Sequence, residues 1–285
     1  MTPNRSRALE PVRAAAVAGS WYPDVPEVLA RDVDGYLDAV EPSMNTDVSA
    51  LIAPHAGLMY SGPVGAYAYR AVQGQTYDVA VLIGPSHYVG FDGVSTYPRG
   101  SFATPFGPCP VDETIAARLL EGSESVIDYP PAHVREHSLE MQLPFLCRVL
   151  PDTPIVPLVM GFQTRETIID LAETLATTLQ GVRALLVAST DLSHYFDAEH
   201  AARLDARVVD LVNRFDGDGL LSELERYPEH ERGRRVACGG GPTVAVMHAA
   251  QALGATKSAV LQRGDSSDVS GDTAQVVGYL AAAIA

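Results

Sequence analysis

Three apolar segments of the chain each end in a turn that carries a histidine, and this pattern constrains the fold more than any other feature of the sequence. Residues 49–54 lead to His55, and residues 78–84 lead to His87. Residues 184–189 lead through a polar turn to His194. A short apolar run that stops at Pro, Gly or Ser is typical of a strand buried on both faces. Because ligands of open α/β sheets bind beyond the carboxyl ends of the strands, the pattern predicts a site at one sheet edge.

Helical spacing alternates with these strands along the chain. The interval from His55 to His87 has the length of one strand–helix–strand unit, so we expect their two strands to be adjacent and parallel. The remaining segments that we expect to be regular are helices over 26–41, 62–72, 112–121, 138–150, 165–179, 198–225 (two helices) and 238–253, and strands over 154–159, 257–263 and 273–281. The alternation predicts an α/β protein, a single-domain three-layer α/β/α sandwich with a mostly parallel central sheet. We expect residues 1–16 to form a flexible N-terminal arm and residues 17–285 to form the one domain.

Composition excludes several classes of function. The 285 residues are 47% apolar, which supports a large core, and the net charge of −15 disfavours binding to nucleic acid or to anionic membranes. No apolar run reaches the ~18 residues of a membrane helix, and the polar first ten residues lack the core of a signal peptide. We therefore expect a cytoplasmic protein. Three scattered cysteines are too few for a disulfide framework.

Two histidines and one cysteine are candidate metal ligands. A single histidine after a strand is a hydrogen-bonding loop residue at least as often as it is a metal ligand. Two of them, His55 and His87, at equivalent strand ends favour a shared site, and neutral imidazole is a common metal ligand. Cys238 precedes three glycines, a proline and a predicted helix. A position at a helix N-terminus stabilises the thiolate, which is the metal-binding form. The alternative is a small buried residue beside a turn.

Other polar residues near the strand ends are candidates for acid–base chemistry or for lining the pocket. His194 is a candidate acid–base group or metal ligand, and Asp191 is a candidate to orient either His194 or a metal-bound histidine. The alternative interpretation makes Asp191 the N-cap of a helix. His137 is expected in the pocket, with Ser138 as an N-cap in the alternative interpretation. Ser86 is also expected in the pocket. Its position beside His87 raises the alternative of a serine hydrolase, but no Gly-x-Ser-x-Gly elbow is present. The other histidines are expected on the surface or in packing: His133, His200, His230 and His248. The Gly-Lys-Ser/Thr ending of a P-loop is absent, so no nucleotide cofactor is expected.

Six blocks of the sequence, in order, resemble the Memo family, also known as AmmeMemoRadiSam system protein B. They are residues 18–22, 52–57, 84–87, 136–144, 189–194 and 238–242. The resemblance implies the fold of the class III extradiol dioxygenases, which is that of their LigB-type subunit. In those enzymes two histidines and a carboxylate hold Fe(II), and another histidine is the acid–base catalyst.

Carried over block by block, the resemblance implies a role for each candidate. His55 and His87 are the two histidine ligands, and Cys238 stands where the dioxygenases have their carboxylate ligand. His194 takes the acid–base position. Asp191, His137 and the single tryptophan, Trp21, line the same pocket. Because a thiolate is softer than a carboxylate, the set favours copper or zinc over iron, although iron is also compatible with the resemblance.

Three functions follow from these expectations. The first is a metal-dependent oxidoreductase, related to the dioxygenases, that uses copper or iron on a small-molecule or peptide substrate. The second is a binding protein without turnover, since animal Memo proteins are associated with phosphorylated peptides and a fold can be reused as a receptor. The third is a subunit of a modification pathway with AMMECR1-like and radical SAM proteins, which the family name implies.

Overall fold

The computed structural model describes residues 11–41 and 47–285. Its strands are β1 Val12–Arg13, β2 Ala50–Ala53, β3 Val79–Pro85, β4 Val94–Thr96, β5 Ser101–Thr104, β6 Gly107–Pro110, β7 Val126–Asp128, β8 Ile155–Met160, β9 Ala184–Ser189, β10 His194–Phe196, β11 Ser258–Asp265 and β12 Val276–Ile284. Its helices are α1 Pro26–Asp38, α2 Leu58–Arg70, α3 Glu113–Gly122, α4 Pro131–Val134, the 3₁₀ turn η1 Glu140–Gln142, α5 Leu143–Val149, α6 Arg165–Thr178, α7 Ala198–Asn213, α8 Gly217–Glu225, α9 Glu229–Arg235, α10 Gly240–Ala252 and α11 Ser267–Ser270.

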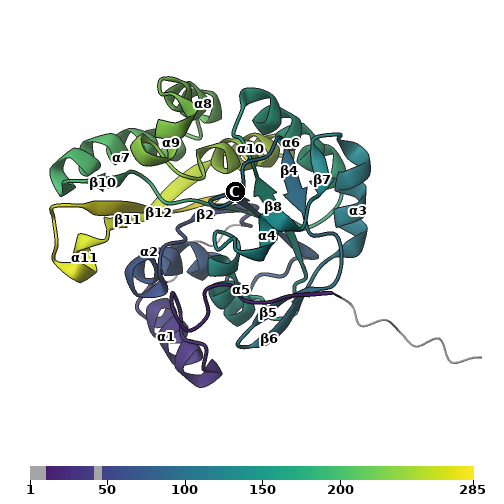
Figure 1. Ribbon diagram of the computed structural model, residues 1–285, viewed down its shortest axis with the longest axis horizontal. Helices are drawn as coiled ribbons and strands as arrows, with labels where there is room; N and C mark the ends of the chain where they lie inside the picture. The colour runs from purple at the N-terminus through teal and green to yellow at the C-terminus, as the bar shows by residue number, and fades with distance from the viewer. Residues whose placement is uncertain (1–10, 42–46) are drawn as a thin grey trace, which may run out of the picture.

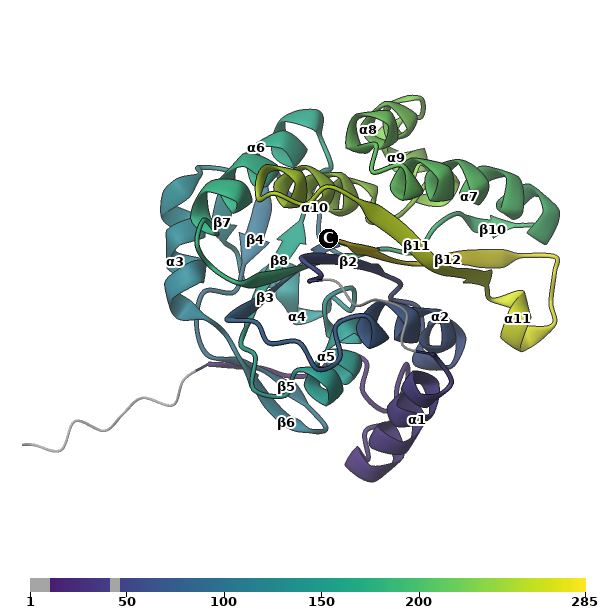
Figure 2. The same ribbon diagram turned by 180° about the vertical axis from the view of Figure 1, so that it is seen from behind.

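A large sheet forms the middle layer of the molecule. Its strands follow the order β10-β12-β2-β9-β3-β8-β4-β7, and β11 pairs with β12. The central strands β2, β9, β3 and β8 are parallel, whereas antiparallel pairs flank them at β12 and β4. Helices α6, α7, α8 and α10 cover one face, and α1, α2 and α5 cover the other (Figure 1 and, from behind, Figure 2). The predicted three-layer α/β/α fold is confirmed.

The central strands form because their residues can be buried on both faces. Every residue of β2, β3 and β8 is buried, and these strands consist mainly of Val, Ile, Leu and Ala. Burying one such aliphatic side chain stabilises the fold by about 1.5–3 kcal/mol. Helix α10 is buried almost all round because it lies between the sheet and helices α6 and α8.

One prediction about the sheet is wrong. The strands that lead to His55 and His87 are parallel but not adjacent, because β9 lies between β2 and β3 and pairs with both. A strand–helix–strand unit fixes the direction of its second strand, but a third strand can insert between the two. The insertion brings the end of β9 between the two histidine-bearing ends.

Several predicted boundaries also change. Helix α2 begins at Leu58, four residues before the expected start, since Pro63 is accommodated inside it. The predicted helix over 138–150 divides into η1 and α5, and Pro144 lies in the first turn of α5, where its missing N–H costs nothing. The short elements β1, β7, α4 and α9 have no counterpart among the predictions.

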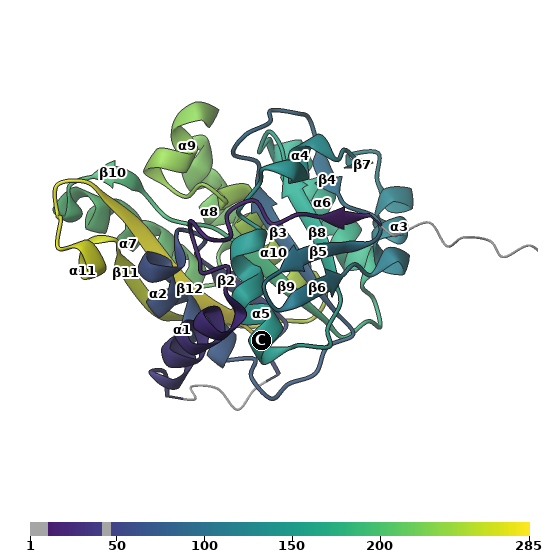
Figure 3. The same cartoon turned by 60° about the horizontal axis from the view of Figure 1, so that its bottom comes forward.

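The described part of the N-terminal arm, residues 11–16, is anchored to the domain, while residues 1–10 lie outside the described residues. Strand β1 joins β5 and β6 in a small second sheet next to α5 (Figure 3). The buried Arg13 forms an ion pair with the buried Glu140. The same carboxylate accepts hydrogen bonds from the N–H groups of Ala16 (2.8 Å) and Val17 (3.0 Å) and from the Tyr22 hydroxyl (2.7 Å). Glu140 therefore fixes the chain on both sides of residues 18–21.

No helix in the described residues is long and apolar enough to cross a membrane.

We predict that Glu140→Ala destabilises the protein by about 3–5 kcal/mol, because it leaves the Arg13 charge buried without its partner. Urea unfolding followed by circular dichroism measures the loss. The matched control is Asp32→Ala, which breaks an exposed pair with Arg31 and is expected to cost less than about 1 kcal/mol. Equal losses in the two variants would show that Glu140 does not stabilise this segment.

Candidate functional site

Strands β2, β9 and β3 are each followed by a polar residue, two positions after the last residue of the strand. His55 follows Ala53, the last residue of β2, by two positions. Asp191 follows Ser189 of β9, and His87 follows Pro85 of β3, by the same two positions. Because the parallel strands end at one edge of the sheet, these three side chains meet there.

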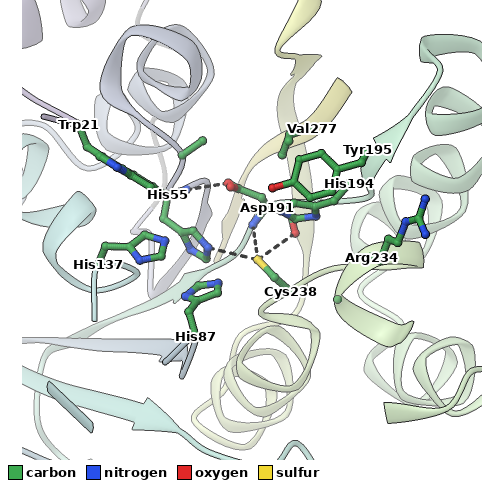
Figure 4. A pocket seen from close by; sticks show the side chains of 12 residues that line it. Trp21, His55, His87, His137, Asp191, His194, Tyr195, Arg234, Cys238 and Val277 are labelled. Atoms are coloured by element: carbon green, nitrogen blue, oxygen red, sulfur yellow. Dashed lines mark hydrogen bonds between the residues drawn. The ribbon is translucent and has the colours of Figure 1, made fainter. Parts of the chain in front are cut away.

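A cavity of about 410 Å³ opens at this edge, and most of the predicted site residues line it (Figure 4). They are Trp21, His55, His87, His137, Asp191, His194 and Cys238. Ser86 lies outside this cavity and donates a hydrogen bond to the Val89 carbonyl (2.7 Å). It lines a neighbouring cavity that shares His87 and Cys238 with the first.

Three imidazoles converge in the cavity. Each ring contributes one nitrogen atom, and these three atoms, from His55, His87 and His137, lie within 4.8 Å of one another. The ring of His137 stacks on that of His87 with centroids 4.4 Å apart. Such a group can hold a metal ion, and it includes His137, which the sequence analysis placed only in the pocket.

Cys238, two residues before α10, lies beside this group. Its Sγ lies 3.2 Å from His55 Nε2 and 3.3 Å from the backbone nitrogen of Asp191. The turn is held by Gly239, whose N–H donates to Thr190 Oγ1 (2.9 Å). A Cβ at Gly239 would lie 2.2 Å from the Ser189 carbonyl oxygen, so only glycine permits this close approach to β9.

The hydrogen bonds around His55 fix which nitrogen faces the cavity. Ser189 Oγ donates to the Ser138 carbonyl (2.6 Å) and accepts from Gln142 Nε2 (2.7 Å). Its one hydrogen is thereby used, so His55 Nδ1, at 2.9 Å, must be the donor. In the neutral form of His55 the lone pair is then on Nε2, the nitrogen that faces Cys238, and this is the position that a proton or a metal ion can occupy.

Glu136 orients His87 in the same way. Its carboxylate accepts from His87 Nδ1 (2.8 Å) and from the His87 backbone N–H (2.6 Å). A carboxylate on the far nitrogen fixes the tautomer of a histidine and raises its basicity as a ligand. The sequence analysis assigned Glu136 no role, although its place beside His137 was a usable signal.

Asp191 is not a helix N-cap, because β10 and not a helix follows it. Its carboxylate accepts a hydrogen bond from the His55 backbone N–H (2.8 Å). Burial raises the pKa of Asp191, an effect that the nearby His194 opposes. His194 begins β10, and its buried Nδ1 has no hydrogen-bond partner among the described residues.

Neighbouring side chains in this cluster carry opposite charges. Burial opposes the thiolate of Cys238, but the neighbouring His55 and His87 outweigh it and lower the pKa of the thiol to about 6. Burial likewise disfavours a charged His87, but the Cys238 sulfur and Glu136 outweigh it and raise the pKa of His87 to about 10. Burial and the two neighbouring imidazoles lower the pKa of His137 to about 3. Near neutral pH the metal-free site therefore holds a Cys238 thiolate, a His87 imidazolium and a neutral His137.

The donor set fits a transition metal. Direct bonds of about 2.0–2.3 Å around a tetrahedral ion place neighbouring ligand atoms about 3.5 Å apart. The separation of Cys238 Sγ from His55 Nε2, 3.2 Å, is close to that value. In their neutral forms His55 and His87 each carry the hydrogen on Nδ1, so a metal ion that displaces the proton from Nε2 of His87 would find Nε2 of both rings available, and Cys238 would supply the thiolate.

Comparison with known proteins gives matches over nearly the whole chain. The sequence profile of the family described as Memo-like protein matches residues 13–283. A MEMO1 family protein of Methanosarcina acetivorans is 36% identical over 275 residues, which are 95% of this chain and 98% of that protein. A MEMO1 family protein of Aquifex aeolicus is 34% identical over 270 residues, covering 94% and 97%. The crystal structure of the uncharacterized protein JW3007 from Escherichia coli K12 has a TM-score of 0.54 at 15% identity, covering 81% of this chain and 99% of that one, which shows a shared fold.

We predict that alkylation of Cys238 by iodoacetamide in the metal-free protein accelerates as the pH rises through about 6, because the thiolate is the nucleophile. Peptide mass spectrometry separates Cys238 from Cys109 and Cys147. In His55→Ala the midpoint is expected to move up toward the ordinary thiol value of about 8.5, since a stabilising neighbour is lost. His248→Ala, a histidine remote from the cavity, is the control and is expected to leave the midpoint in place. A midpoint near 8.5 in the unsubstituted protein would contradict the prediction.

Proposed function

The chain belongs to the Memo family, and from that premise we propose that it is a metal-dependent oxidoreductase whose single metal ion is held by His55, His87 and Cys238. One observation carries the proposal: two imidazoles of fixed tautomer and one thiolate meet in a cavity that also opens outward. His137, stacked on His87, is available as a further ligand. Two imidazoles and a thiolate suit copper best, with iron and zinc as alternatives.

A bound copper or iron ion would supply electron transfer to O₂ or to an organic substrate. The protein's own groups then have distinct tasks. Ser189 and Glu136 hold His55 and His87 with Nε2 free, and Asp191 fixes the backbone of His55. His194, which lines the same cavity with Nδ1 unpaired, is placed to give a proton to a substrate or to accept one.

Trp21 forms one wall of the cavity, beside the proposed metal ligands. Trp21 contacts His137, with ring centroids 4.4 Å apart, and covers the donor group on the side opposite α9. The segment that carries Trp21 is fixed by Glu140 at Val17 and Tyr22. This covering limits the access of water to the donors while the opposite side of the cavity stays open.

We predict that the anaerobically purified protein binds one equivalent of copper or iron. His55→Ala, His87→Ala and Cys238→Ala are each expected to weaken binding at least about 100-fold, since each removes a direct ligand, whereas lost outer partners already cost 10–100-fold. Competition with a chelator of known affinity measures the change. His248→Ala and Cys109→Ala are the matched controls. Unchanged binding in all three site variants would place the metal elsewhere.

We predict that His194→Gln keeps the full metal content but lowers turnover about 10²–10⁴-fold, because proton transfer is lost while the ligands stay intact. Oxygen consumption by the metal-loaded protein with ascorbate as electron donor measures turnover. His200→Gln, on α7 and outside the cavity, is the control. If no metal-loaded form consumes oxygen with ascorbate or with an aromatic reductant, the oxidoreductase proposal fails, and the receptor interpretation of the fold takes its place.

A further inference from the structure

The cavity extends past the metal donors to a side that the proposed chemistry leaves unused. Tyr195, Arg234 and Val277 line this side. Figure 4 shows Trp21 and Arg234 on opposite sides of the donor group, with His194 and Tyr195 between the donors and Arg234. A ligand that reaches the donors therefore also meets these residues.

Arg234 is the arginine that lines this cavity, and it belongs to the minority of described arginines that form no ion pair. Ten described arginines form an ion pair with a carboxylate. Arg234 has no ion pair and donates no hydrogen bond to any residue that the structure describes. Its guanidinium carbon lies 4.7 Å from the centre of the Phe196 ring. Stacking occupies the face of a guanidinium and leaves the N–H donors at its edge free, and their fork geometry matches a carboxylate.

The side chain of Tyr195 is presented to the cavity by an uncommon backbone conformation. Tyr195 has φ 61°, in the left-handed region, and its side chain is 60% exposed. Large residues rarely adopt this conformation, and such strain concentrates at ligand sites. Trp21, 37% exposed, gives a second flat apolar surface. Two exposed aromatic rings around one cavity fit a flat apolar ligand body better than a flexible polar one.

We propose that this cavity binds a flat organic acid, an aromatic carboxylate, with the carboxylate on Arg234 and the ring beside Tyr195. Such a ligand places its far end toward His194 and the metal donors. As a statement about the substrate class, this inference rests on the proposed function. As a statement about binding, it rests only on Arg234, Tyr195 and the cavity.

Titration of the metal-free protein with benzoate and with benzamide tests the inference. The two probes have the same shape and differ in charge, and the emission of Trp21, the only tryptophan, reports on this cavity. Benzoate is expected to bind at least about tenfold more tightly than benzamide, which is the effect of one charge-assisted hydrogen-bonded pair. Arg234→Gln is expected to weaken benzoate about 10–100-fold and to change benzamide less than about twofold. Arg234→Lys is expected to recover part of the benzoate affinity.

The control variant is Arg203→Gln, which removes the same charge from an exposed position on α7 and is expected to leave both affinities unchanged. No saturable benzoate binding, or equal affinities for the two probes, would overturn the inference. Equal losses of both probes in Arg234→Gln would overturn it too, since Arg234 would then act on the shape of the cavity and not on the anion. Because no metal is present, a failure here is separate from a failure of the metal proposal, which the metal content alone decides.

Discussion

The parallel pairing of β9 with both β2 and β3 is the constraint on which the site depends. Residue Ala53 pairs with Ser189, and Ile83 pairs with Ala188, so the three strands end almost level. His55, Asp191 and His87 then lie side by side because each follows its strand by two residues. A shift of one residue in a strand would turn its side chains to the opposite face and would separate the donors. The same strand register that builds the apolar core therefore also positions the candidate metal ligands.

Much of the fold follows from the local pattern of the sequence, but the order of the strands does not. The apolar runs that form β2, β3 and β9 are recognisable because they are short, are rich in branched aliphatic side chains and end at Pro, Gly or Ser. Which strand pairs with which depends on contacts between segments far apart in the chain, and nothing in the runs themselves encodes it. The sequence therefore predicts the ends of these three strands to within one residue, but it places β2 beside β3, where the structure has β9.

The same distinction applies to the site. His55, His87 and Cys238 were recognisable because soft donors at strand and helix ends are uncommon, and the structure brings their side chains together. Glu136 and Ser189 were not assigned a role, because carboxylates and hydroxyls are abundant and their hydrogen bonds to histidines appear only in three dimensions. Arg234 and Tyr195 carry even less local signal. Their meaning comes from a missing ion pair and a left-handed backbone angle, neither of which a sequence displays.

Charge balance connects the donor set to the outer part of the cavity. Burying an uncompensated charge is costly, so a buried metal site is most stable when its ligands cancel the charge of the ion. Two neutral imidazoles and one thiolate cancel a single positive charge. A monovalent ion at this proposed site would thus be fully compensated by Cys238, whereas a divalent ion would leave one positive charge in the cavity. That excess, together with the unpaired guanidinium of Arg234, would make the cavity attractive to an anion within a protein whose overall charge is −15. The acidic surface would repel such a ligand at long range, and the pocket would select it only at short range, where screening by salt is weakest.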